Sequence, residues 1–534
     1  MPTEPFEWSE FEVPSLAGAV TVSLPDLTPW PTPIAKAQVL LESAAEVEHA
    51  LMVQYLYAAF SLKTSKEVTD PAQKAVLSES SPRAWPASLL SIAREEMGHL
   101  MTVQNLLLLL GLAPNFERED FPPRKDLYPF ALHLQPLTQR SLAKYVVAEA
   151  PSDAEGIDDV LALATESAGA TINHVGVLYG LLGLVFSTED QVKTGASGDA
   201  EWDGIVRQLS AAAYQQAPAS SWHLADADFH SDSVAQQADP DDWQVSHLRV
   251  HRTADRAQAV QALRDIGEQG EGPTGSDEPS HFARFLGMFR GQGTMAAFPA
   301  AGEWVPTRAA PSDPKVQDFT EPRTRRWAEL ADIRYALLLG FIEHYLLAPA
   351  ARSVLTGWIF AEMRSRIGFM GRELTGMPRG GGADAGVAAI AFTLPADLHL
   401  PGDEPARWLV HRGRTEAAIA KIEEMRADDA GDGQSAYLAE LLESDNARLA
   451  LMSAPDGPVT TSFARDIRPL FRVKDVQHMS FNGVDLDTYD GARGDAAKIV
   501  DKVRAGLMPP RPDQPWTKPQ VDLVDRWIKE GFPK

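Results

Sequence analysis

Residues 89–110 read LLSIAREEMGHLMTVQNLLLLL, and within this apolar stretch Glu96 and His99 stand three residues apart. Both lie on the same helix face as Ile92 and Val103, because these positions recur at intervals of three and four. Side chains three apart on a helix project from the same side and can reach one metal ion. Burying a carboxylate and an imidazole costs free energy unless they are paired or bind a metal. The stretch therefore predicts a buried helix with metal ligands directed inward.

A second glutamate, Glu48, has similar surroundings within residues 34–63, where apolar residues also recur at helical spacing. It shares a face with Leu51, Met52 and Tyr55, so its carboxylate is expected to point into the core. An inward carboxylate on another helix is what a shared metal site requires.

Four charged residues near these ligands fall off the apolar faces. Glu46 and His49 repeat the Glu-x-x-His spacing but lie on a more polar side, which predicts surface residues or hydrogen-bond partners of the ligands. Arg94 and Glu95 fall off the face that carries Glu96. We leave all four out of the predicted ligand set.

A second Glu-x-x-His pair, Glu278 and His281, opens a helix that continues through Phe285 and Met288. One such pair is common by chance, and its plain alternative is a solvated face or a histidine satisfied within the core. Two pairs and an inward glutamate weigh against that alternative. Carboxylate-bridged di-iron proteins use one Glu from each of two helices and a Glu-x-x-His pair from each of two others.

The composition restricts the remaining chemistry. The 534 residues contain no cysteine, which excludes disulfides, iron–sulfur clusters and thiol nucleophiles, so a metal must bind to His, carboxylate or water. The 74 acidic and 49 basic residues give a net charge of −25, which disfavours nucleic acid as a partner. The acidic N-terminus does not resemble a signal peptide, and the longest apolar run is too short to span a membrane. We expect a cytoplasmic protein without a membrane partner.

The periodicity predicts a mainly α protein: a four-helix bundle with additional helices and a small α-helical C-terminal domain. Its expected segments are an extended lead-in over residues 1–35, a metal-binding bundle over 36–300, a helical extension over 301–455 and a module over 461–534. The bundle is expected to contain a long connecting insertion over about 190–275. Residues 461–534 carry 13 basic and 11 acidic side chains, a net charge of +2 against −27 for the rest, which marks them as a separate module.

The motifs resemble a known family. Residues 41–58 are similar to the first helix, and residues 94–107 to the second helix, of the ferritin-like family found in violacein-type iminophenyl-pyruvate dimer synthases. Residues 266–272 and 280–285 resemble that family's Gln-Gly-Glu-Gly and Ser-His-aromatic-x-Arg-Phe stretches. The resemblance spans roughly residues 36–290. It implies a ferritin-like bundle with ligand roles for the residues Glu48, Glu96, His99, Glu278 and His281.

The third helix departs from the family pattern. Aligning Gly176 and Tyr179 with that pattern puts Val177 where a glutamate is expected, whereas the other register puts His174 there. His174 lies one turn from Val177, which makes it a candidate neutral ligand. The alternative is a core histidine bonded to a helix carbonyl. A site short of one carboxylate is expected to hold one metal tightly and one weakly, or a single metal.

The C-terminal module, residues 461–534, resembles a cytochrome c-like domain without the cysteines that attach haem. Covalent haem is therefore excluded, and non-covalent haem on His478 or Met508 is the weaker alternative to a structural or docking role.

The resulting functional prediction is an iron-dependent oxidase or oxygenase, with a di-iron or mononuclear site, that uses dioxygen on a small molecule. The resemblance implies an amino-acid-derived substrate in secondary metabolism. Tyr55 and Tyr57 are candidate catalytic residues, as hydrogen-bond donors or redox relays near Glu48, although packed core tyrosines are the alternative. A homodimer and a redox partner protein both remain open. The rival function is a non-catalytic metal-binding scaffold or partner subunit with a partly decayed site.

Overall fold

The structure is a computed structural model of the 534-residue chain. It describes residues 7–534 apart from 16–17, 79–80, 82–83, 119–132, 152–153, 169–174, 196, 244–247, 272–278, 293–294, 301–302, 383–385, 397, 428–433, 453–460, 472–474, 477–478, 480–482, 506, 509–515, 517, 530 and 533.

Helices dominate the described residues. The N-terminal half contains β1 (Trp8–Ser15), β2 (Gly18–Pro25), α1 (Pro33–Ser61), α2 (Pro71–Val76), α3 (Trp85–Leu109), α4 (Gln139–Ala148), α5 (Asp158–Ala168), α6 (Val175–Phe186), α7 (Glu189–Thr194), α8 (Ala200–Gln216), α9 (Arg256–Glu271) and α10 (His281–Arg290). The C-terminal half contains α11 (Pro322–Leu347), α12 (Arg352–Ala361), the π-helix η6 (Glu362–Ile367), α13 (Gly368–Leu374), α14 (Glu404–Ala427), α15 (Ser435–Met452), the π-helix η7 (Phe463–Ile467), α17 (Tyr489–Arg504) and α18 (Lys518–Lys529). Short 3₁₀ turns are η1 (Ala219–Ser221), η2 (Asp226–Asp228), η3 (Ser231–Ala235), η4 (Val316–Asp318), η5 (Pro349–Ala351) and η8 (Arg468–Leu470).

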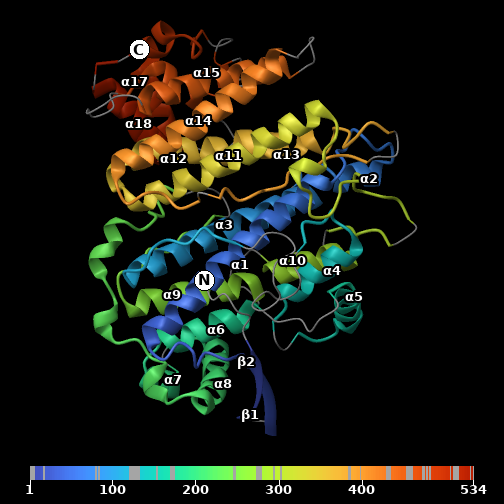
Figure 1. The fold of residues 1–534 in the computed structure, drawn as a ribbon, viewed down its shortest axis with the longest axis vertical. Helices are drawn as coiled ribbons and strands as arrows, with labels where there is room; N and C mark the ends of the chain where they lie inside the picture. The colour runs from blue at the N-terminus through green and yellow to red at the C-terminus, as the bar shows by residue number, and fades with distance from the viewer. Residues whose placement is uncertain are drawn as a thin grey trace.

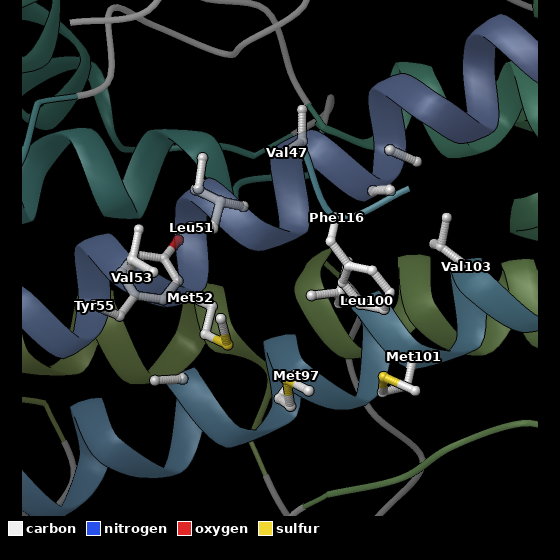
Figure 2. Close-up of a cluster of buried hydrophobic side chains, with 14 of the residues drawn as sticks. Val47, Leu51, Met52, Val53, Tyr55, Met97, Leu100, Met101, Val103 and Phe116 are labelled. Atoms are coloured by element: carbon white, nitrogen blue, oxygen red, sulfur yellow. The ribbon is translucent and has the colours of Figure 1, made fainter. Parts of the chain in front are cut away.

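The two long helices α1 and α3 pack along each other and form the centre of the N-terminal bundle (Figure 1). The α1 helix starts where the Thr32 side chain accepts a hydrogen bond from the Ala35 amide and Pro33 occupies the first turn. Figure 2 shows buried apolar side chains of both helices, with Met52 of α1 pointing toward α3, which carries Met97 and Leu100. The apolar residues on the facing sides of α1 and α3 are buried by this contact.

The other two sides of the bundle are built from shorter helices. The α6 helix packs on α1 and α9, and α4 packs on α10. The α4 helix ends at Glu149, and α10 begins at His281, where the Ser280 side chain caps the helix by accepting from the Ala283 amide. Both helix ends therefore place a polar side chain inside the bundle.

Two expectations for irregular segments need correction. Residues 1–35 were expected to be an extended lead-in, but β1 and β2 form an antiparallel hairpin that packs on α8. Residues 190–275 were expected to be a connection, yet they contain the regular helices α8 and α9. In α9 the buried residues Ala259, Leu263 and Ile266 recur at helical spacing, a signal obscured by the abundant Gly, Gln and Asp around them.

The C-terminal half forms a second layer of helices, α11 to α15, beyond α1 and α3 (Figure 1). Within the predicted helical extension over 301–455, α12 and α13 are joined by one π-helical turn, η6. At that turn the buried Glu362 is paired with Arg366 and Arg448. The nearby buried Arg334 pairs with Asp445 of α15. These ion pairs hold η6 against α11 and α15.

Residues 463–532 enclose a hydrophobic cluster of their own around the fully buried Trp527. This cluster touches the rest of the chain through α12 and α15, where the Arg526 guanidinium donates a 2.8 Å hydrogen bond to the Ser353 hydroxyl. Among the described residues, no helix combines the length and apolar character needed to cross a bilayer.

Candidate metal centre

Five buried side chains from four elements converge between α1, α3, α4 and α10. They are Glu48 of α1, Glu96 and His99 of α3, Glu149 at the end of α4, and His281 at the start of α10. Each is at most 4% exposed. They form two groups with ligand atoms close enough for one metal ion, Glu48 with Glu96 and His99, and Glu96 with Glu149 and His281.

The first group meets at Nδ1 of His99. This nitrogen lies 3.3 Å from Oε2 of Glu48 and 3.0 Å from Oε2 of Glu96. The second group meets at Nδ1 of His281, which lies 3.1 Å from Oε1 of Glu96 and 3.6 Å from Oε2 of Glu149. The two oxygens of Glu96 therefore face different groups, which is the arrangement of a bridging carboxylate.

The outer nitrogen of each imidazole also has a partner. Nε2 of His99 lies 3.1 Å from the amide oxygen of Gln269, and Nε2 of His281 lies 2.7 Å from Oε2 of Glu95. A proton held on Nε2 by such an acceptor leaves Nδ1 free to bind a metal. Both rings are thus oriented with Nδ1 toward the cluster.

Glu95 was expected to lie off the buried face, but it is 2% exposed and paired. The Arg284 guanidinium donates to both of its oxygens, and the Ser91 hydroxyl donates to Oε1 at 3.0 Å. The apolar stripe of α3 is wider than the sequence pattern indicated because α10 and α9 also pack on this side. The expectation failed because it treated α3 as having only one buried face.

Two tyrosines donate to the terminal carboxylates. The Tyr179 hydroxyl of α6 donates to Oε1 of Glu48, and the Tyr55 hydroxyl donates to Oε1 of Glu149 at 2.6 Å. Each bond engages one oxygen and leaves Oε2 on the side of the histidine. Tyr57, by contrast, donates to the backbone carbonyl of Pro311 and not to a residue of the cluster.

Buried polar atoms of the cluster that lack hydrogen-bond partners show that these residues fit a bound metal ion. Within the part of the chain that the structure describes, Oε2 of Glu48, Oε1 of Glu96 and Nδ1 of His281 are buried and have no hydrogen-bond partner. Leaving buried polar atoms unpaired is costly, so such atoms are rare in folded proteins. Here they face one another, as atoms do that share a cation.

Without metal, the pKa values of the cluster favour protons on Glu48 and His99, at the positions where a metal ion would bind. Burial, together with the neighbouring Glu96 carboxylate, raises the pKa of the Glu48 carboxyl to about 8. Burial opposes charge on His99, but the carboxylates of Glu48 and Glu96, 3.3 Å and 3.0 Å from its Nδ1, raise its pKa to about 10. Burial would raise the pKa of Glu96, yet His281 and His99 outweigh it and lower that pKa. Metal binding must therefore displace protons.

The structure brings together four of the predicted ligands, Glu48, Glu96, His99 and His281, and places Tyr55 beside them. Glu278 and His174 lie outside the described residues. His49, set aside because of its polar neighbours, is fully buried, and its Nε2 hydrogen-bonds the Tyr335 hydroxyl. Burial lowers the pKa of His49 to about 3.

Sequence reasoning missed Glu149. Its signal is present, because Glu149 follows Leu142 and Tyr145 on the same face of the amphipathic helix α4. The family pattern places the expected third-helix glutamate within residues 171–179, far from Glu149 in the sequence. Glu149 supplies a carboxylate that the alignment of Val177 had suggested was missing.

Comparisons with known proteins agree with this architecture. Residues 41–290 match the ferritin-like family model. Dichlorochromopyrrolate synthase of Lentzea aerocolonigenes is 25% identical over 340 residues, which cover 58% of this chain and 31% of that protein. No solved structure gave a significant match. With the helices described above, the family match confirms the predicted mainly α, ferritin-like fold.

Proposed function

We propose that this chain is an iron-dependent oxidase or oxygenase that acts on a small, amino-acid-derived molecule in secondary metabolism. The observation that carries the proposal is Glu96, whose two oxygens face two separate carboxylate–imidazole groups. A carboxylate in a structural ion pair needs only one charged partner, whereas a carboxylate that bridges two metal ions must direct one oxygen to each metal position. The two oxygens of Glu96 are directed in the second way.

Imidazole and carboxylate ligands suit iron, and each group leaves positions for other ligands because it contributes only three protein side chains. Iron bound there would supply the electrons needed to reduce dioxygen. Within the chain, the hydroxyls of Tyr179 and Tyr55 hold the outer oxygens of the terminal carboxylates. The buried apolar residues Met52, Met97 and Leu100 (Figure 2) are neighbours of the ligands in the sequence of α1 and α3, and they limit access of water.

The substrate class rests on resemblance. The motifs resemble the iminophenyl-pyruvate dimer synthases, and the matched relative is named as a synthase of dichlorochromopyrrolate. These likenesses support a small substrate derived from an amino acid, with dioxygen as co-substrate.

For residues 461–534 we keep the proposal of a cytochrome c-like module without covalent haem, in a structural or docking role. Its support is the separate hydrophobic cluster around Trp527, to which Met508 contributes a partly buried side chain. His478, the other candidate haem ligand, lies outside the described residues.

Oxygen uptake by the purified chain tests the proposed function. Metal-free protein given Fe(II) and a reductant should consume dioxygen faster than buffer with the same iron. Glu96→Gln, which removes the shared charge without changing the side chain's size, should lower that rate at least about tenfold. Glu404→Gln is the matched control, because Glu404 accepts from a buried histidine, His344, in the other helical layer.

Metal uptake without oxygen consumption would contradict the enzyme proposal and favour the non-catalytic scaffold. Equal rates in the wild type and Glu96→Gln would show that the oxygen chemistry takes place elsewhere.

A further inference from the structure

The two metal-binding groups have the same kinds of ligand but different surroundings. Each consists of one terminal glutamate, the shared Glu96 and one histidine whose Nδ1 faces the carboxylates. Each terminal glutamate also accepts a tyrosine hydroxyl on its outer oxygen. The ligands and tyrosines therefore do not distinguish the two positions.

The difference lies behind the imidazoles. The outer nitrogen of His99 meets a neutral amide oxygen, that of Gln269, at 3.1 Å. The outer nitrogen of His281 meets a carboxylate oxygen, that of Glu95, at 2.7 Å. One histidine thus donates to a neutral acceptor and the other to a charged one.

The surrounding contacts fix this difference. The Gln269 side-chain nitrogen donates to Oε2 of Glu95 at 3.1 Å, which turns the amide oxygen toward His99. Glu95 is kept ionised by the Arg284 guanidinium, which donates to both carboxylate oxygens, and by the Ser91 hydroxyl. Gln269 and Glu95 therefore cannot exchange roles without breaking these bonds.

A carboxylate behind a histidine pulls on the Nε2 proton and makes the opposite nitrogen a stronger donor to metal. A neutral amide in the same place polarises the Nε2 proton less, so it strengthens the opposite nitrogen as a metal ligand less. Arg284 donates to both oxygens of Glu95, including the Oε2 that faces His281, so its positive charge partly offsets the charge of Glu95. The Glu95–His281 contact still acts directly on the ligand ring, whereas Arg284 acts on that ring through Glu95.

From these contacts we infer that Glu95 makes the two metal positions unequal. The position of Glu96, Glu149 and His281 binds a divalent metal more tightly than the position of Glu48, Glu96 and His99. The inference rests on the proposed function only in requiring that the cluster bind metal. It implies ordered loading, in which the His281 position fills first and the His99 position holds the more exchangeable ion.

The test measures each position separately, with Co(II) as the probe under anaerobic conditions and the full-length chain. Glu48→Ala leaves only the His281 position complete, and Glu149→Ala leaves only the His99 position. Titration followed by calorimetry and visible absorption should give a tighter Kd in the Glu48→Ala background. Adding Glu95→Gln should weaken binding there about 10–100-fold, and in the Glu149→Ala background less than about threefold. Glu404→Gln should leave both values unchanged.

A reciprocal exchange guards against a merely structural effect of Glu95→Gln. The double variant Glu95→Gln with Gln269→Glu keeps the total charge and places the carboxylate behind His99. In this variant the order of the two affinities should be reversed, with circular dichroism matching that of the wild type.

Equal weakening in both backgrounds, or an unchanged order after the exchange, would overturn the inference while leaving the proposed function intact. Failure of the wild type to bind Co(II) at the cluster would contradict the proposed function and the inference together.

Discussion

At the scale of single residues, Glu96 and the two histidines, His99 and His281, define the two metal-binding groups. Glu96 is 2% exposed, yet nearby histidines lower its pKa despite burial. Its position on the inner face of α3 follows from the intervals of three and four that link it to Ile92 and His99. The inward direction of these ligands was therefore predictable from the sequence.

The raised pKa values of Glu48 and His99 predict how pH affects the metal-free chain. The folded pKa of Glu48 is about 8 and that of His99 about 10, both above their ordinary values of 4.5 and 6.5. A group with a raised pKa stabilises the fold below its ordinary value, and that stability is lost as the pH rises through the folded value. Between pH 6.5 and 8 the folded state binds more protons than the unfolded state at both groups.

The free energy of unfolding of the metal-free protein should therefore fall from pH 6.5 to 8, by on the order of 1 kcal/mol per pH unit for each group. The unfolding temperature should fall with it. Glu48→Gln should lose less stability over this range, since its amide does not titrate. Metal-loaded protein should also lose less, because the metal occupies the place of the protons. A thermal melt that is flat or rises over this range in the metal-free wild type would contradict the assignment.

At the scale of elements, the long helices α1 and α3 and their ligands were predictable from the sequence, but the ligand at the end of the short helix α4 was not. The apolar periodicity of α1 and α3 extends over whole helices, so their faces and ligands could be predicted. Glu149 stands at the end of the ten-residue helix α4, and its partners in α10 and α1 are far away in the sequence. Tertiary packing brings these ends together, and one chain's local pattern does not reveal that packing.

Gly98 of α3 lies against the backbone of Arg249, in the segment that precedes α9. A Cβ atom at Gly98 would overlap the Arg249 carbonyl oxygen, and the next residues are tied to α3 by the His251 amide, which donates to the Thr102 hydroxyl at 3.0 Å. Gly98→Ala should destabilise the chain by about 1–3 kcal/mol. Because Gly98 lies between Glu96 and His99, the variant should also weaken metal binding.

Gly413→Ala is the control, since Gly413 is within α14 and no neighbouring atom lies within 4 Å of an added Cβ. It should be neutral or stabilising by up to about 1 kcal/mol. Urea denaturation and Co(II) titration of both variants make the comparison. If Gly98→Ala matches Gly413→Ala in both measurements, the close contact between α3 and Arg249 is not important.

At the scale of the whole molecule, the ferritin-like bundle occupies one part of a larger helical protein (Figure 1). The charge shift at residue 461 predicted a separate module, and the hydrophobic cluster of residues 463–532 is in accord with that prediction. The module boundaries remain a prediction, and so does the role of the module. The helical layer from α11 to α15 could be predicted as helices, but not its buried ion pairs, because Arg334 and Asp445 are 111 residues apart.

Deletion of residues 461–534 should leave a folded chain that binds metal as the full-length protein does. The module touches the rest through α12 and α15, and the metal ligands all lie on other helices. Circular dichroism and elemental analysis of the truncated protein provide the measurement. Aggregation or loss of metal would show that the module is an integral part of the fold.

The central claim is that Glu96 joins two iron positions, and an anomalous-scattering map of crystals of the iron-loaded chain tests it most directly. Data collected at the iron absorption edge should show two peaks. One should lie between Glu48, Glu96 and His99, and the other between Glu96, Glu149 and His281. Absence of iron from this cluster, or iron bound only at other residues, would contradict the account.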